Sequence, residues 1–181
     1  MKKLAILLVV CFVFTLGLSA YKTFQAITHP IKYENIIISN ANKFSIPSYV
    51  VASLINVESS YKENAISNKD ALGLMQIKLS TAQYMNEFYN LNNSLDQNDL
   101  LSAETNIEYG CRYLKYLIDK FEDIYTALSA YNAGETRVRV WLRDENFSKD
   151  GKTLFYIPYS ETDKYIEKIK NNMKFYEKIY K

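Results

Sequence analysis

Apolar residues in the larger part of the chain recur at helical spacing, and this pattern predicts four helices. In residues 47–60, Val51, Leu54, Ile55 and position 58 fall at i, i+3, i+4 and i+7, on one face of a helix. Residues 102–121, 123–133 and 160–180 carry similar stripes, formed by Ile107, Cys111, Leu114, Ile118 and Phe121, by Ile124, Ala127, Leu128 and Tyr131, and by Ile166, Ile169, Met173, Tyr176 and Tyr180. Five glycines and three prolines leave few turn signals for a many-stranded fold. The pattern therefore predicts an all-α domain.

Residues beside these stripes suit helix ends and close packing. Pro47 fits the first turn of a helix, and Ser160 with Asp163 three residues later resembles a capping box. Gly134 would end the 123–133 helix as a left-handed residue. Gly110 borders an apolar stripe, where it either lets another helix approach closely or is an incidental weak point.

The N-terminal pattern is different, because residues 4–21 contain no charge. Eighteen helical residues span roughly 27 Å, which is enough to cross the core of a bilayer. This run exceeds the usual length of a signal-peptide apolar region, and Leu18 occupies a position where cleavage requires a small residue. We expect residues 1–22 to be a retained membrane anchor; a cleaved signal peptide and a secreted domain are the alternative.

Lys2 and Lys3 would hold the N-terminus in the cytoplasm and place the rest of the chain outside the membrane. Residues 23–32, which include Pro30, are expected to form a linker. Residues 33–181 would then be one extracytoplasmic domain.

Composition and charge narrow the possible functions. Hydrophobic residues make up 48% of the chain and charged residues 23%, which is typical of a globular protein. A net charge of +2 gives no electrostatic reason to expect a nucleic-acid partner. One histidine, His29, and two cysteines cannot supply a four-ligand zinc site of the usual type. We expect neither a metal nor a cofactor.

Glu58 is the polar residue on the apolar face of segment 47–60. Burial without a partner would raise the pKa of its carboxyl, and so would a position near a helix C-terminus. A carboxyl protonated near neutrality is suited to general acid catalysis. In the other interpretation the helix ends here and the side chain turns into water. The spacing alone leaves both open.

Five motifs follow one another along the domain: VESSYKENAIS (57–67), ALGLMQI (71–77), ETNIEYG (104–110), ALSAYNAG (127–134) and IPYSETDKYI (157–166). In this order and spacing they resemble the SLT-type lytic transglycosylases of the goose-lysozyme type, glycoside hydrolase family 23. The resemblance covers about residues 33–180. It implies a lysozyme-like helical fold, and cleavage of peptidoglycan glycan strands between N-acetylmuramic acid and N-acetylglucosamine.

The resemblance makes Glu58 the catalytic residue, with Tyr131 facing the cleft beside it. It implies contacts with the glycan or shaping of its cleft for Ser67, Met75, Gln76, Tyr131, Asn132, Tyr159 and Glu161. Simpler interpretations remain open for four of these positions. Tyr131 would be a hydrogen-bonded core residue, Ser67 a turn residue, Met75 a core residue, and Glu161 an acidic residue in a first helical turn.

Glycosidases normally use two carboxylates, about 5–5.5 Å apart for retention and about 6.5–9.5 Å apart for inversion. Only Glu58 is well placed, since Glu63 and Asp70 lie in a polar loop and Asp70 stands where the family commonly has glycine. The family reaction needs one carboxyl: it protonates the linking oxygen, then takes the proton of the sugar's C6 hydroxyl as that oxygen closes onto C1. The product is a 1,6-anhydromuramoyl end.

Two other activities remain open at this stage. A lysozyme-like muramidase would use water and a second carboxylate, and a non-catalytic scaffold would bind glycan without cleaving it. The sequence departs from the family at Lys78 and Leu79, where Met-Pro is common, and at Asp163, where arginine is usual. Lys78 either brings a positive charge to the cleft or points to solvent.

Overall fold

The computed structural model describes residues 2–180, with the side chains of residues 3, 6 and 10–180. The elements are α1 (Lys2–Thr28), α2 (Glu34–Lys43), α3 (Ser48–Ser59), β1 (Ala71–Leu72), β2 (Ile77–Lys78), α4 (Leu79–Phe88), the 3₁₀ turn η1 (Asp99–Leu101), α5 (Ala103–Phe121), α6 (Ile124–Ala133), α7 (Glu135–Leu142) and α8 (Ser160–Tyr180). Strands β1 and β2 form a short antiparallel hairpin in which Leu72 pairs with Ile77. The all-α prediction is confirmed.

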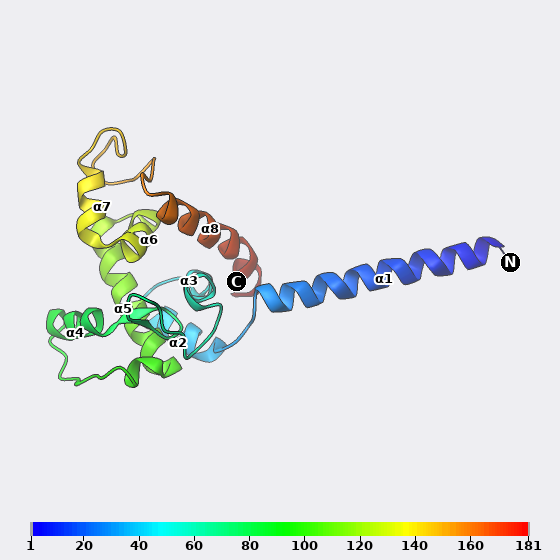
Figure 1. The fold of residues 1–181 in the computed structure, drawn as a ribbon, viewed down its shortest axis with the longest axis horizontal. Helices are drawn as coiled ribbons and strands as arrows, with labels where there is room; N and C mark the ends of the chain where they lie inside the picture. The colour runs from blue at the N-terminus through cyan, green and yellow to red at the C-terminus, as the bar shows by residue number, and fades with distance from the viewer. Residues whose placement is uncertain (1, 181) are drawn as a thin grey trace.

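Helices α3 and α5 form the centre of the domain (Figure 1). Helix α3 packs mainly against α8 and also against α2, while α5 packs against α6, α2, α4 and the hairpin. Leu54 and Ile55 of α3 are fully buried, as the apolar stripe predicts. Of the stripe predicted along α5, Ile107, Cys111 and Leu114 are fully buried. The core therefore supports α3 from both sides.

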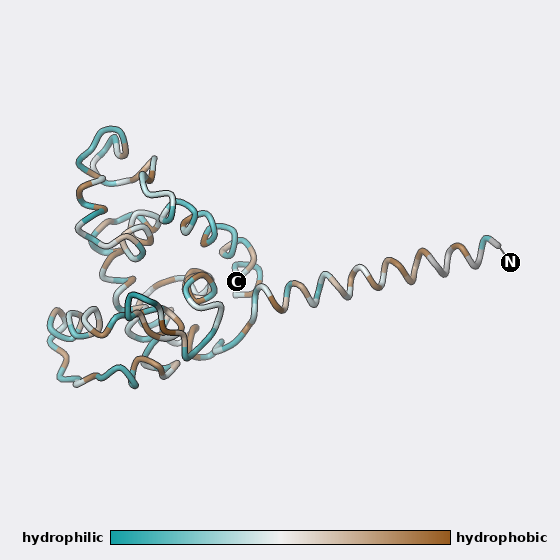
Figure 2. The backbone as a smooth tube through the Cα atoms, in the orientation of Figure 1, coloured by the Kyte–Doolittle hydropathy of each residue, from teal (hydrophilic) through white to brown (hydrophobic). Residues whose placement is uncertain are grey.

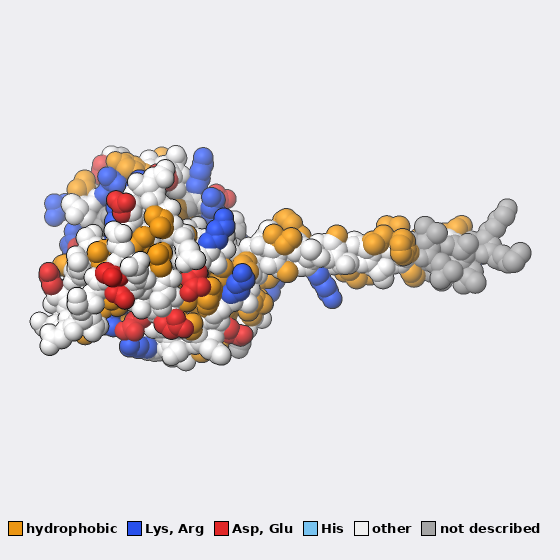
Figure 3. All heavy atoms as spheres, turned by 60° about the horizontal axis from the view of Figure 1, so that its bottom comes forward, with side chains coloured by type: hydrophobic (Ala, Val, Ile, Leu, Met, Phe, Trp, Pro, Cys, Tyr) orange, Lys and Arg blue, Asp and Glu red, His pale blue; other side chains and the backbone are white. Residues whose placement is uncertain are grey.

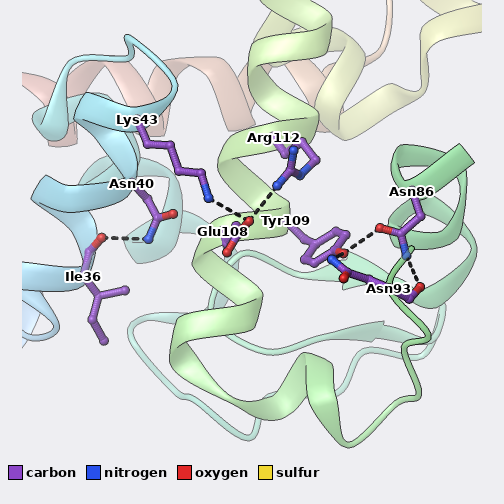
Figure 4. A network of polar contacts seen from close by, with 8 residues as sticks. All are labelled: Ile36, Asn40, Lys43, Asn86, Asn93, Glu108, Tyr109 and Arg112. Carbon is purple, nitrogen blue, oxygen red and sulfur yellow. Dashed lines mark hydrogen bonds and ion pairs between the residues drawn. The ribbon is translucent and has the colours of Figure 1, made fainter. Parts of the chain in front are cut away.

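The polar face of α5 attaches to its neighbours through a network shown in Figure 4. Lys43 of α2 and Arg112 of α5 both donate to Glu108, at 3.0 and 2.6 Å. Tyr109 donates to the side-chain carbonyl of Asn86 on α4 at 2.6 Å. These bonds hold α2 and α4 on either side of α5.

Gly110 permits close approach, as one interpretation of the sequence held. That interpretation expected another helix at this position, but the approaching group is a side chain from a loop. The side chain of Met75, from the loop between β1 and β2, lies against Gly110. A Cβ at position 110 would be 2.4 Å from the Met75 sulfur. Glycine is therefore required by packing.

Gly110→Ala is expected to lower the free energy of unfolding by about 1–3 kcal/mol, because the added methyl overpacks the core. Helix propensity alone predicts the opposite, a gain of roughly 1 kcal/mol. Denaturant unfolding measures the sign. Gly110→Ala combined with Met75→Ala should lose less than the two single changes added together, and a stabilising Gly110→Ala would contradict the packing.

Three predicted helix ends need correction. Pro47 is the N-cap residue of α3, which begins at Ser48, rather than a residue of its first turn. The backbone of Gly134 has φ +91° and ψ 141°, so it leaves α6 with a positive φ but does not adopt the left-handed helical conformation. Ser160 is the first residue of α8 rather than its cap. The carbonyl of Tyr159 accepts the first helical bond, from the amide of Asp163 at 2.9 Å.

Helix α1 projects from the domain as a single long helix (Figure 1) in which hydrophobic residues recur along the backbone (Figure 2). Many of its described apolar side chains from Val10 onward are exposed (Figure 3). By length and composition, Val10–Thr28 is a candidate membrane span, and none of that window is buried. Residues 23–28, expected to be linker, continue the helix to Thr28.

Candidate active site

Glu58 lies in the last turn of α3, which packs against α8, and α8 in turn packs against α6. Its side chain is partly buried, and one carboxyl oxygen accepts a hydrogen bond from Tyr165 at 2.6 Å. Burial raises the pKa of Glu58 to about 7, while the bond from Tyr165 acts in the opposite direction. The side chain is therefore not fully solvated, contrary to one interpretation of the sequence. Because its pKa is about 7, both protonation states are populated near neutral pH.

Two tyrosines accompany this carboxyl. Tyr165 comes from α8, and Tyr131 from the last turn of α6. Burial raises the pKa of both hydroxyls, and the charge of Glu58 raises them further, because each lies close to it. Tyr131 donates to the backbone carbonyl of Met75 at 2.8 Å. Tyr131 is therefore both a hydrogen-bonded interior residue and a neighbour of Glu58.

The hairpin that carries Met75 is held by Asn106 of α5. The side-chain carbonyl of Asn106 accepts from the amide of Met75 at 2.7 Å, and its amide donates to the carbonyls of Leu72 and Leu100 at 2.8 and 2.6 Å. A Cβ at Gly73 would lie 2.2 Å from that amide. Asn106 thus fixes the carbonyl on which Tyr131 is anchored.

Met75 and Gln76 contribute differently from one another. The side chain of Met75 is fully buried, so it belongs to the core, and its backbone carbonyl is the part held toward Tyr131. Gln76 has φ +50° and donates its side-chain amide to the carbonyls of Ala65 and Gly73. This residue is partly exposed and shapes the loop.

Ser67 lies in the turn before β1. Its hydroxyl oxygen accepts from the amides of Lys69 and Ala71, at 3.3 and 3.0 Å. Within residues 2–180, no hydrogen bond joins Ser67 to Glu58. The hydrogen bonds of Ser67 are therefore those of a turn residue, which was the simpler interpretation of this position.

Asn132 and Thr162 connect α6 to α8. The hydroxyl of Thr162 donates to Asn132 at 2.8 Å, and Thr162 is almost fully buried. Since Tyr165 lies three residues further along α8, this bond fixes the helix that presents Tyr165 to Glu58. Asn132 therefore helps to position α8, and with it Tyr165, relative to α6.

Tyr159 and Glu161 lie at the exposed start of α8. The ring of Tyr159 packs at a tilt of 59° against the buried Trp141, with 5.1 Å between ring centroids, and the guanidinium of Arg137 lies over the Tyr159 ring at 4.9 Å. These three residues line an open cavity of about 490 Å³ that begins at Ala133, directly after Asn132. Glu161 is solvent-exposed in the first helical turn, as its position along the sequence predicts.

No second carboxylate perturbs Glu58 in the part of the chain that the structure describes. Glu63 accepts from the Tyr33 hydroxyl at 2.8 Å and from the amide of Ala103 at 3.1 Å, so it caps α5. Asp70 is exposed with φ +58°, a conformation that glycine adopts readily. Neither carboxylate is among the groups that shift the pKa of Glu58.

Comparison with known proteins agrees with this geometry. The family model described as "Transglycosylase SLT domain" matches residues 35–154, more than half of the chain. The chain belongs to the transglycosylase SLT domain family.

Individual relatives support this membership. The chain is 31% identical over 143 residues to the soluble lytic murein transglycosylase of Escherichia coli, which covers 77% of this chain and 22% of that protein. It is 32% identical over 142 residues to the membrane-bound lytic murein transglycosylase E of Buchnera aphidicola, covering 73% of this chain and 61% of that protein.

A solved structure of the lytic transglycosylase Slt from Pseudomonas aeruginosa, an inactive glutamate-to-glutamine mutant, superposes with a TM-score of 0.75 at 25% identity. It covers 86% of this chain and 25% of that one. A solved complex of the 70-kDa soluble lytic transglycosylase with bulgecin A gives a TM-score of 0.74 at 26% identity and covers 83% of this chain and 25% of that one. This SLT chain therefore spans about a quarter of the length of these solved relatives.

Sequence reasoning missed two residues of the candidate site, Tyr165 and Asn106. Tyr165 stands inside the motif IPYSETDKYI and four residues before Ile169, so it shares the apolar face of α8. Asn106 stands inside ETNIEYG, beside the apolar Ile107. The helical stripe could have revealed the first; nothing local reveals the second.

The stability of the SLT domain should fall as pH rises through neutrality. The pKa of Glu58 is near 4.5 in the unfolded chain and about 7 in the folded one, so the folded chain binds more protons between these values. Relative to Glu58→Gln, the wild type should lose about 3 kcal/mol of unfolding free energy between pH 4 and pH 8. Urea unfolding of the full chain in detergent measures this difference, and a difference that does not change with pH would contradict a buried carboxyl.

Tyr165→Phe removes a bond that stabilises the charged form of Glu58, so it should raise the pKa of that carboxyl further. The alkaline limb of the activity profile is expected to move to higher pH. Tyr180→Phe is a matched control on α8, because that hydroxyl has no partner within the described residues. A limb that stays in place, or moves to lower pH, would exclude this role for Tyr165.

Proposed function

We propose that this chain is a membrane-anchored lytic transglycosylase that cleaves peptidoglycan between N-acetylmuramic acid and N-acetylglucosamine. One observation carries the proposal: Glu58 is the only carboxyl in the described site, and its pKa of about 7 lets it act in both protonation states. The names of the relatives, lytic murein transglycosylases, support the same activity.

The reaction begins with Glu58 protonated. Its proton passes to the oxygen that links the two sugars, and the bond from that oxygen to C1 of the muramoyl residue breaks. The N-acetyl group of the same sugar stabilises the cationic carbon. Tyr165, donating to the carboxylate that remains, offsets the cost of leaving a negative charge in a partly buried site.

The second step restores the acid. The carboxylate of Glu58 takes the proton of the C6 hydroxyl while the C6 oxygen bonds to C1, which yields a 1,6-anhydro ring. No water is consumed, so no second carboxylate is required to activate one. This balance accounts for a site with a single carboxyl, whereas hydrolysis by two carboxylates needs a second group about 5–9.5 Å away.

The remaining site residues have proposed roles of two kinds. Tyr131, Asn132, Met75 through its carbonyl, Gln76 and Ser67 hold the loops and helix ends around Glu58. Tyr159 and Glu161 are the exposed positions for contact with the glycan, since an aromatic ring offers an apolar face for the C–H groups of a sugar and a carboxylate accepts hydrogen bonds from its hydroxyls.

Residues 1–22 are proposed to anchor the protein in the cell membrane, with residues 33–181 as the catalytic domain outside the cytoplasm. The candidate span Val10–Thr28 and the positive charges of Lys2 and Lys3 support this orientation.

Mass spectrometry of the fragments released from purified peptidoglycan by the detergent-solubilised full chain tests the activity. Muropeptides one water lighter than reducing sugars are expected. Reducing-end products would instead establish a hydrolase, and retained binding of peptidoglycan without released fragments would establish a scaffold.

A further inference from the structure

The end of α1 is bonded to the domain, although the sequence predicts a linker there. The side-chain amide of Asn56, on α3, donates to the backbone carbonyl of Thr28 at 2.8 Å. That carbonyl belongs to the last turn of α1, where helical carbonyls lack partners within the helix. Asn56 therefore satisfies an otherwise free end of α1.

Tyr176 of α8 extends the same connection. Its hydroxyl accepts from Asn56 at 3.0 Å and donates to the carbonyl of Pro30 at 3.0 Å. Tyr176 is fully buried, and its ring also faces Tyr61 at 6.2 Å. One hydrogen-bonded chain thus runs from Thr28 through α3 and α8 to Pro30.

His29 closes the joint with an aromatic contact. Its ring packs at a tilt of 31° against Phe175, with 4.2 Å between ring centroids, and lies 5.9 Å from the ring of Tyr176. Burial lowers the pKa of His29, which keeps the ring neutral in this contact. A flexible linker leaves its backbone groups to water, whereas the carbonyls of Thr28 and Pro30 are bonded to side chains of two different helices.

We propose that α1 and the helical domain are joined rigidly at Thr28–Pro30, and that this joint restricts cleavage to glycan lying next to the membrane. The proposal rests on the function given above, because it takes α1 as the anchor and Glu58 as the catalytic carboxyl. It adds which part of the peptidoglycan serves as substrate.

The position of Asn56 limits the height of the site. Asn56 and Glu58 are two residues apart on α3, so the Glu58 carboxyl lies no more than roughly 16 Å from the Thr28 carbonyl, whatever the direction. Thr28 is six residues after Lys22 along α1, which adds about 9 Å. Glu58 is then within about 25 Å of the level of Lys22, and closer if the span is Val10–Thr28.

A flexible segment in the same place would behave differently. Ten extended residues reach about 33–36 Å and leave the orientation of the domain free. The bonded joint at Thr28–Pro30 prevents the domain from moving away from the membrane and from rotating relative to α1. Glycan strands further from the bilayer are therefore outside the working range of Glu58.

Spin-label distance measurements on the full chain in lipid nanodiscs test the rigidity. Labels at Thr23→Cys on α1 and Glu87→Cys on α4, with Cys11→Ser, should give one narrow distance distribution. Insertion of twelve Gly/Ser residues after Thr28, a flexible segment of roughly 20 Å, should broaden it. Asn56→Ala with Tyr176→Phe should broaden it in the same direction without adding length. A wild-type distribution as broad as that of the insertion would overturn the joint.

Cleavage assays test the restriction. In proteoliposomes, the wild type and the insertion variant should cleave lipid-linked, uncross-linked glycan strands in the same bilayer equally well. On insoluble peptidoglycan sheets added outside, the insertion variant should release at least tenfold more than the wild type. Equal release would overturn the restriction. A wild type that cleaves neither substrate even in detergent would instead contradict the proposed function, while the spin-label distances report the joint independently.

Discussion

Glu58→Gln should leave the chain folded and reduce the rate of glycan cleavage by at least about a thousandfold, since proton transfer by one side chain contributes roughly 10²–10⁴ and this one serves twice. Glutamine keeps the shape of the side chain and an oxygen that accepts from Tyr165. It cannot release or take up the proton that both steps require. Release of soluble fragments from purified peptidoglycan measures the rate.

Glu87→Gln provides the matched control, because it makes the same chemical change at an exposed position of α4. Its rate should stay within a factor of two of the wild type. If Glu58→Gln retained a tenth of the wild-type rate, another group would have to supply the proton.

Asn106→Leu is expected to cost about 3–5 kcal/mol of unfolding free energy, because it leaves buried backbone groups without partners at roughly 1–3 kcal/mol each. The groups are the amide of Met75 and the carbonyls of Leu72 and Leu100. The change should also lower activity in the folded fraction, since the hairpin that anchors Tyr131 loses its support. The shift of the denaturant midpoint measures the first effect.

Asn98→Leu makes the same change at an exposed position just before η1 and should alter stability by less than about 0.5 kcal/mol. Comparable losses in the two variants would mean that the Asn106 bonds contribute little. If Asn106→Leu kept the wild-type activity per folded molecule, the position of the β1–β2 hairpin would not affect catalysis.

The long helices could be predicted from the sequence because each carries a continuous apolar stripe. Ile107, Cys111 and Leu114 on α5, and Ile166 and Ile169 on α8, are buried as their spacing requires. Helices α2, α4 and α7 bury only two or three residues each, and strands β1 and β2 have two residues each, so they carry too few buried positions for a stripe to appear in the sequence.

Site residues could be predicted from the sequence where the residue type does not suit its position in the helical pattern. Glu58 stands out as a carboxylate on an apolar face, and the structure bears out its partial burial. Tyr165 was missed because a tyrosine on such a face conflicts with nothing. Asn106 was missed because its partners are backbone atoms up to 34 residues away, which no side-chain pattern marks.

The joint at Thr28–Pro30 is the feature that sequence reasoning had least chance of finding. Asn56 and Tyr176 are 120 residues apart, and each is an ordinary residue of its own helix. Two of the departures from the family pattern are at the surface, Lys78 at the end of β2 and Asp163 on α8, whereas Leu79 at the start of α4 is partly buried against the core.

Titration of the Glu58 carboxyl by ¹³C NMR, assigned by comparison with Glu58→Gln, tests most directly whether this side chain can serve as both acid and base. Burial among Tyr131 and Tyr165 predicts a midpoint near pH 7. A midpoint near 4.5, the ordinary value for glutamate, would show a solvated carboxylate and contradict the proposed role.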